Sequence, residues 1–126
     1  MKLLVSHTNY PAQFRRFIPL WLAEGHDVVF LFRNKEWHSV THDRLRLCHY
    51  NRSRESQNPY LHPYLRRLEA SVLEGQAAFR KALDLKNDGW IPDVVVSHVG
   101  FGNGLFLKDL FPNSFRIGLI EWFYNA

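Results

Sequence analysis

Apolar residues along the chain alternate between short runs and longer segments with helical spacing. Residues 2–6 and 27–33 are apolar runs, and the second is unbroken. Between them, apolar side chains recur at the spacing of three and four residues that gathers them on one helical face. They are Phe14, Phe17, Ile18, Trp21 and Leu22. The pattern predicts a strand, then a helix that is kinked or loosened at Pro19, and then a second strand buried on both faces. Gly25 is expected to end the helix in a left-handed backbone conformation.

The second part of the chain continues this alternation. Residues 45–50 alternate as a third strand does, and residues 51–58 are typical of an exposed loop. A long helix is expected to begin near Pro59 or Pro63 and to stop near residues 87–89. Its periodic apolar residues are Leu65, Leu68, Val72, Phe79 and Leu83. Residues 93–98 predict another doubly buried strand, residues 103–111 a short helix, and residues 115–121 a final strand.

Apolar strands separated by helices favour a parallel sheet, because parallel neighbours need crossover connections and covered faces. With right-handed crossovers, the expected fold class is α/β: a Rossmann-like three-layer sandwich with about five strands in the order 3-2-1-4-5. Residues 1–126 would form one such domain.

This topology indicates where chemistry should gather, since ligands of such sheets bind beyond the carboxyl ends of the strands. The residues that follow the five predicted strands are His7 and Asn9, Arg33, residues 49–52, residues 98–104, and residues 121–124.

Two of these residues are catalytic candidates. His98, at the end of a buried strand, has a side chain suited to general base catalysis, although a lone histidine also serves structural roles. Glu121 could act as a base, orient His98, or be an exposed residue of the last strand. His7 and Asn9 can exchange hydrogen bonds with a ligand in the same cleft, and Asn9 could instead cap the first helix.

A glycine-rich turn follows the fourth predicted strand. Gly100, Gly102 and Asn103 would offer backbone N–H groups and an amide at a helix N-terminus, which suits a phosphate or a sugar hydroxyl. The alternative is that the glycines only permit a tight turn. The turn after the first strand contains no glycine, so neither a dinucleotide fingerprint nor a phosphate-binding P-loop is supported.

Composition narrows the class of protein further. The single cysteine, Cys48, excludes an internal disulfide framework and suits a reducing compartment, so a cytoplasmic location is expected. No metal is expected, because the spacing of the possible ligands matches no closed zinc pattern. Those ligands are His38, His42, Cys48 and His49. The apolar runs are too short to span a bilayer, and the first residues do not resemble a signal peptide.

The formal net charge is +4, with 16 Lys and Arg against 12 Asp and Glu, and the whole excess lies in residues 1–63. Residues 33–54 carry six basic and two acidic side chains. This basic stretch indicates either an anionic ligand or surface, such as the face of a membrane, or simply a solvated arginine-rich loop. No nucleic-acid-binding signature accompanies it.

Several stretches together resemble a known family. Residues 22–29, with Gly25-His26 followed by Val28, resemble the Gly-His-x-Val stretch of GT-B glycosyltransferases. Residues 14–19, 62–69, 92–98 and 105–112 are similar to the amino-terminal domain of glycosyltransferase family 4. The resemblance implies an acceptor-side Rossmann-like domain, facing a second domain that holds a nucleotide-sugar, with retaining transfer and without a metal.

In this family a histidine near the strand ends is catalytic or contacts the donor, and the resemblance implies that His98 is its counterpart. Glu121 lies at the end of the last predicted strand. The carboxy-terminal donor-binding domain that it implies is absent from these residues, so the chain alone is expected to be inactive and to need that domain or a separate subunit. A non-catalytic α/β module that binds an anionic partner through residues 33–54 is the alternative function. The last strand would leave an open sheet edge, so the isolated domain is expected to form homo-oligomers.

Overall fold

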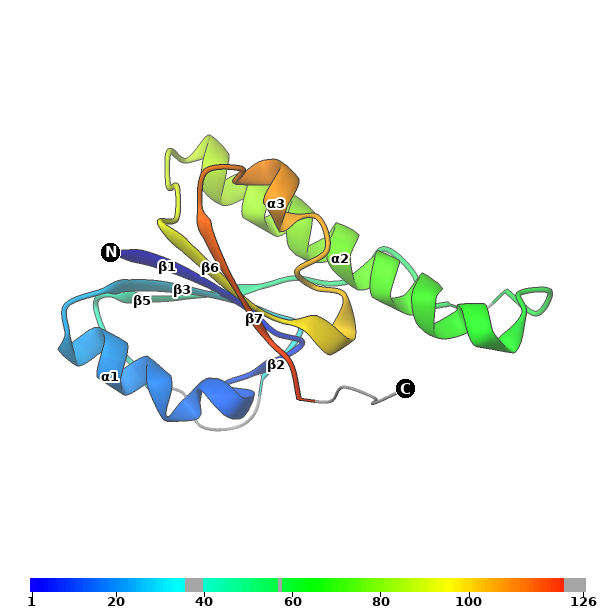
Figure 1. Ribbon diagram of the computed structural model, residues 1–126, viewed down its shortest axis with the longest axis horizontal. Helices are drawn as coiled ribbons and strands as arrows, with labels where there is room; N and C mark the ends of the chain where they lie inside the picture. The colour runs from blue at the N-terminus through cyan, green and yellow to red at the C-terminus, as the bar shows by residue number, and fades with distance from the viewer. Residues whose placement is uncertain (36–39, 57, 122–126) are drawn as a thin grey trace.

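A five-stranded parallel sheet forms the centre of the computed structural model, which describes residues 1–35, 40–56 and 58–121. Its strands lie in the order β5-β3-β1-β6-β7 (Figure 1). Their bounds are Lys2–Ser6 for β1, Asp27–Phe32 for β3, Leu45–His49 for β5, Val94–His98 for β6 and Phe115–Leu119 for β7. Counted along the chain within this sheet, the order is 3-2-1-4-5, so the predicted α/β Rossmann-like topology is confirmed.

Two very short strands were not predicted. β2 (Asn9–Tyr10) and β4 (Asn34–Lys35) pair in parallel just beyond β1 and β3. Two residues are too few to show an alternation, which explains why the sequence pattern missed them. Their pairing carries Asn9 and Asn34 past the carboxyl edge of the main sheet.

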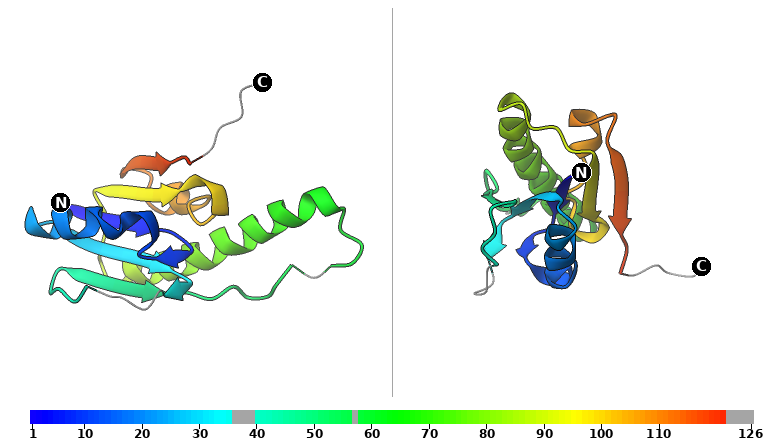
Figure 2. Two further views of the ribbon diagram at one scale, coloured as in Figure 1. Left: turned by 90° about the horizontal axis from the view of Figure 1, so that it is seen from below. Right: turned by 90° about the vertical axis from the view of Figure 1, so that its left-hand side faces the viewer.

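Helices cover both faces of the sheet, as the two side views in Figure 2 show. On one face, α1 (Phe17–Ala23) and the preceding 3-10 helix η1 (Ala12–Arg15) pack over a cluster that includes Leu3, Val5 and Phe30. On the other face, α2 (Pro63–Asn87) and α3 (Leu107–Leu110) cover a cluster that includes Leu4 and Leu31. Alternate residues of β1, β3, β5 and β6 therefore supply the two cores, which gives the predicted three layers.

The first predicted helix is broken as its proline suggests. Pro19 is the third residue of α1, where its missing N–H is tolerated, and the turns before Phe17 form η1 instead. Gly25 ends the helix with φ +84°. One part of the expected apolar face was wrong, because Phe17 is 50% exposed and stacks on Trp21 rather than entering the core.

The long helix α2 is confirmed, but its expected apolar face is buried only in part: Phe79 packs against the core and Val72 is half-buried. Leu65, Leu68 and Leu83 are exposed, whereas the buried residues begin at Leu73 and include three alanines. The reason is visible in Figure 1, where the first part of α2 runs beyond the sheet. Periodicity identifies a helix, but the sheet beneath it decides which face and which part are covered.

The region after β6 is also shorter and more irregular than predicted. A 3-10 helix, η2 (Val99–Phe101), follows His98, and α3 occupies only part of the expected 103–111 helix. Gly102 follows η2 with φ +84°, and a Cβ built there would lie 2.3 Å from the carbonyl oxygen of Ser71 in α2. Glycine is therefore needed at position 102 both for its backbone conformation and for the close approach of α2.

Gly102→Ala is expected to reduce the free energy of unfolding by about 3 kcal/mol, from a left-handed alanine and an overpacked contact together. Gly89→Ala is the matched control, since Gly89 has φ +81° but a Cβ there meets nothing within 4 Å. It should cost only about 1–2 kcal/mol. Urea unfolding of both variants measures the difference, and equal losses would contradict the packing role of Gly102.

Candidate functional site

Two buried histidines meet at the carboxyl edge of the sheet. His7 follows β1 and is 2% exposed, and His98 ends β6 and is 1% exposed. Their ring centroids are 5.0 Å apart with the rings nearly perpendicular, and Phe101 stacks on His98 at 4.6 Å. Adjacent parallel strands thus bring together two residues that are far apart in the sequence, as the topology predicted.

Both ring nitrogens of His98 have neighbours that define its chemistry. The backbone N–H of Gly100 donates to Nδ1 at 3.1 Å, so Nδ1 carries no proton. The proton of the neutral ring then lies on Nε2, which is 3.1 Å from Oε2 of Glu121. In this arrangement His98 is a donor toward Glu121, and Glu121, with its side chain 29% exposed, is the member of the pair that reaches the surface.

Glu121 lies two residues beyond the end of β7. Besides His98, Gln13 donates a hydrogen bond to its carboxylate from the start of η1. The hydrogen bond from His98 is the main influence that holds the pKa of Glu121 below its ordinary range, and the Gln13 hydrogen bond acts in the same direction. Glu121 is therefore ionised at neutral pH, which makes it a weak base and an effective stabiliser of positive charge.

The Glu121 carboxyl is expected to titrate below its ordinary value of 4.5. Because its pKa is lowered in the folded chain, the contact with His98 contributes stability above pH 4.5 and loses it as the pH falls through the lowered pKa. Carboxyl ¹³C chemical shifts against pH measure this, with Glu121→Gln to assign the signal. In His98→Ala the midpoint should rise toward 4.5, and an unchanged midpoint would contradict the pairing.

The other predicted binding residues after β1 form the wall of a pocket. The backbone N–H of Asn9 donates to Nδ1 of His7 at 2.9 Å, and its side-chain oxygen accepts from the Asn34 amide at 3.0 Å. His7 and Asn9 line a pocket of about 430 Å³ together with Gln13, Arg15 and Phe101. Asn9 pairs with β4 rather than capping a helix, so the capping alternative is not what the structure shows.

The glycines of the glycine-rich turn have structural roles in this arrangement. Gly100 holds His98 through its backbone N–H, and Gly102 permits the approach of α2. Asn103 is fully buried, and its backbone oxygen accepts from Ser6 at 3.3 Å. The binding roles assigned to these three residues stay predictions; Gly100 is exposed, whereas Gly102 and Asn103 are both buried.

A buried acidic residue that the sequence analysis did not select lies beside the histidines. Glu74, on the inner face of α2, has no exposed surface. Its Oε1 accepts from the Tyr50 hydroxyl at 2.7 Å and from Thr8 at 3.2 Å, and its Oε2 accepts from Nε of Arg52 at 2.5 Å. Nε of Arg33 approaches the same Oε2 at 3.2 Å.

This Glu74 network compensates for the burial of a charge. Burial, followed by the hydrogen bond to Glu74, raises the pKa of Tyr50, so its hydroxyl stays a donor. Burial alone would lower the pKa of Arg52, but the hydrogen bond and charge of Glu74 outweigh it and the pKa is raised. Removing one partner of a buried ion pair typically costs about 3–5 kcal/mol. The available signal was an acidic residue between Leu73 and Gly75, about three turns into a helix predicted to pack on the sheet.

The basic stretch divides into residues with different partners. Arg46 lies 3.6 Å from Asp88, Arg54 lies 2.8 Å from Glu69, and Arg44 donates to the carbonyl of Gly25. Arg33 and Arg52, by contrast, converge on Glu74 at the carboxyl edge. Residues 33–54 are therefore not one uniform basic surface.

Among the described residues, no group of three His, Cys, Asp or Glu side chains could hold a metal ion. His38, one of the four possible ligands considered above, lies outside the described residues. Cys48 is buried, and Nε2 of His49 lies 2.9 Å from the carbonyl oxygen of Arg33. No helix in the described part of the chain is long and apolar enough to cross a membrane.

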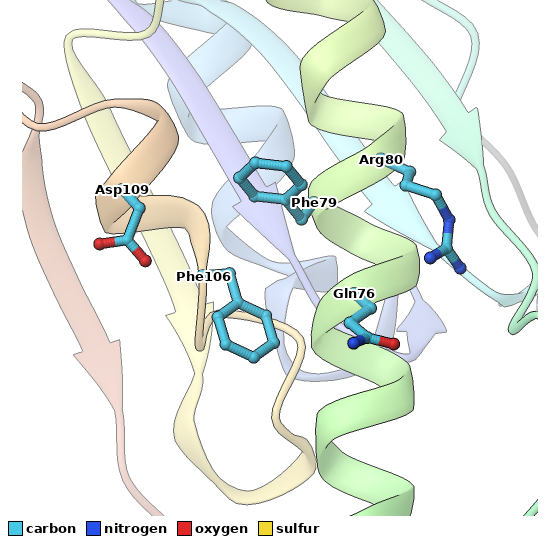
Figure 3. A pocket seen from close by; sticks show the side chains of 5 residues that line it. All are labelled: Gln76, Phe79, Arg80, Phe106 and Asp109. Atoms are coloured by element: carbon cyan, nitrogen blue, oxygen red, sulfur yellow. The ribbon is translucent and has the colours of Figure 1, made fainter.

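A further pocket, of about 430 Å³, lies between α2 and α3 (Figure 3). Phe79 and Phe106 lie between the two helices there, with Asp109 on α3 and Arg80 on α2 at its sides. It is lined by no residue of the histidine cluster or of the Glu74 network. We therefore place the candidate site at the carboxyl edge of the sheet and not in this groove.

Comparison with known families defines the class. The family model described as "Glycosyl transferase family 4 group" matches residues 24–126, most of the chain. The chain therefore belongs to the glycosyl transferase family 4 group, as the resemblance of its sequence stretches predicted. No curated protein and no solved structure matches it.

Proposed function

We propose that the chain is the acceptor-side, amino-terminal domain of a nucleotide-sugar-dependent glycosyltransferase that transfers a hexose to a hydroxyl acceptor with retention. The observation that carries the proposal is the family match on a fold whose carboxyl edge presents the Glu121 and His98 pair. A second domain or subunit would hold the nucleotide-sugar, and residues 1–126 alone would be inactive.

The pair suits the charge that develops during glycosyl transfer. The acceptor oxygen attacks the anomeric carbon, the bond from that carbon to the donor phosphate oxygen breaks with its electron pair staying on the phosphate, and the hydroxyl proton passes to that departing phosphate. Positive charge grows on the sugar ring as this happens. An ionised, partly exposed Glu121 can stabilise that charge, and His98 holds the carboxylate in place from beneath. His98 thus acts through Glu121, while its Nδ1 stays engaged by Gly100.

The alternative of a non-catalytic module for an anionic partner has less support. It needs residues 33–54 to act as one surface, yet Arg46 and Arg54 are paired with acidic side chains. It also gives no role to the carboxylate and histidine pair.

In the full-length protein, His98→Ala is expected to lower kcat by about 10²-fold, the scale of a lost electrostatic or acid–base contribution. Release of nucleoside diphosphate from UDP-, GDP- and ADP-sugars, with a cell extract as the source of acceptors, measures turnover. His26→Ala is the matched control, because His26 precedes β3 at the opposite edge of the sheet.

The control should retain full activity. Turnover that is unchanged in His98→Ala would remove the pair from the mechanism. A full-length protein that releases no nucleoside diphosphate from any donor would contradict the glycosyltransferase proposal itself.

The edge strand β7 supports the expectation that another surface covers this side of the molecule. Phe115 is 68% exposed and Ile117 is 47% exposed, and β7 pairs only with β6 within the main sheet. An unpaired strand edge with apolar side chains readily pairs with another chain. We propose that in the isolated chain a second copy takes this place.

The isolated chain is therefore expected to show a mass that rises with concentration in light scattering. Phe115→Lys should shift it toward the monomer, because a charge on an edge strand opposes pairing. Leu68→Lys is the control, since Leu68 is also exposed, at 60%, but lies on α2. A monomeric mass for the unchanged chain at high concentration would contradict the proposal.

A further inference from the structure

A basic pocket adjoins the histidine cluster at the carboxyl edge of the sheet. Its volume is about 490 Å³, and its walls come from the ends of β1, β3 and β5 and from α2. Three arginines line it: Arg33 after β3, Arg52 after β5, and Arg67 on α2. Asn9, Asn34 and Ser71 add amide and hydroxyl groups, and none of the described residues that line the pocket is acidic.

Two of these arginines belong to the Glu74 network, and the third does not. Arg52 donates to Glu74 through Nε and to Glu55 through Nη1, whereas Nε of Arg33 approaches Glu74 as an ion pair at 3.2 Å. Arg67 does not contact Glu74, and within the described residues it has no ion-pair partner. It is an exposed residue of α2 that lines the pocket.

The charges around the pocket favour an anion. Among the described residues around the pocket, three guanidinium groups face two carboxylates, Glu74 and Glu55, which leaves a net charge of 3 − 2 = +1. Glu74 is buried beneath the arginines, and Glu55, which lies 3.1 Å from Nη1 of Arg52, is 58% exposed to solvent. The planar guanidinium group matches the geometry of phosphate and carboxylate oxygens.

The basic pocket and the pocket beside His7 are neighbours. Asn9 and Phe101 line both. A ligand whose anionic group lies among the arginines therefore extends across Asn9 and Phe101 toward His7 and the Glu121 pair. The Asn9 side-chain oxygen is engaged by Asn34, so an Asn9 contact to such a ligand would come from its amide nitrogen, a donor.

We propose that this pocket binds an anionic group of the acceptor, a phosphate or a carboxylate, and so selects acidic acceptors. Naming the ligand as the acceptor rests on the proposed function, but binding of the anion does not. The arginines hold the charged group on one side of Phe101, and the acceptor hydroxyl approaches Glu121 on the other.

NMR titration of the chain with inorganic phosphate, pyrophosphate and glucuronate tests the pocket, with glucose as the uncharged counterpart of glucuronate. Arg67→Gln should weaken binding of the anions about tenfold, the effect of one charge-assisted hydrogen bond. Arg66→Gln is the matched control, because Arg66 is the adjacent exposed residue of α2, carries the same charge and does not line the pocket. Arg67→Lys should recover part of the affinity.

Two results would contradict anion binding in the pocket: equal weakening of binding in the Arg66 and Arg67 variants, or equal affinity for glucuronate and glucose. Vesicles of phosphatidylglycerol separate a lipid headgroup from a free anion. Binding to them that depends on Arg67 alone supports a headgroup in the pocket. Binding that depends equally on Arg66 and Arg67 assigns recognition to the helix surface and also overturns the pocket.

A final measurement separates acceptor from donor. In the full-length protein, Arg67→Gln should leave the affinity for UDP, GDP and ADP unchanged. A tenfold loss for one of these nucleotides would assign the pocket to the donor diphosphate and overturn the acceptor assignment. Arg67-dependent anion binding in a protein without transferase activity would leave the pocket standing while the proposed function fails.

Discussion

The buried carboxylate of Glu74 ties the carboxyl edge of the sheet to the helix that covers it. It accepts from Thr8 after β1, approaches Arg33 after β3, and accepts from Tyr50 and Arg52 after β5. Three adjacent strands thus end on one side chain of α2. A buried charge needs this many partners because unpaired burial costs several kcal/mol. Two of these partners, Arg33 and Arg52, also line the basic pocket.

The candidate site depends on this anchoring. His98 lies at the end of β6 beside His7, and Oε2 of Glu121, in the chain after β7, lies 3.1 Å from Nε2 of His98. The close contact of Gly102 with Ser71 holds the loop after β6 against α2. The histidine pair and the basic pocket consequently meet at Asn9 and Phe101 on a single edge, which is the side where Rossmann-like sheets bind their ligands.

Sequence patterns anticipated the frame of this arrangement well. The run 27–33 has too few polar residues for a half-exposed strand, and β3 is buried on both faces. The topology rule directed attention to His7, Arg33, residues 49–52, His98 and Glu121, which lie after the five strands. The rule could not foresee Glu74, because a glutamate on a helix is ordinarily solvated, and only the packing of α2 on the sheet shows that it is buried.

The sequence by itself determined the family, the alternation of strands and helices, and the order of the sheet, because these depend on local periodicity and on the chirality of crossovers. Tertiary structure alone decided which side chains touch. Leu65 and Leu68 repeat like core residues but extend past the sheet, whereas Glu74 enters the core beside two arginines from other strands. Likewise, His98 is a donor toward Glu121 because the backbone N–H of Gly100 donates to its other ring nitrogen. Contacts between residues far apart in the chain depend on how the layers pack, and no periodicity along the chain encodes them.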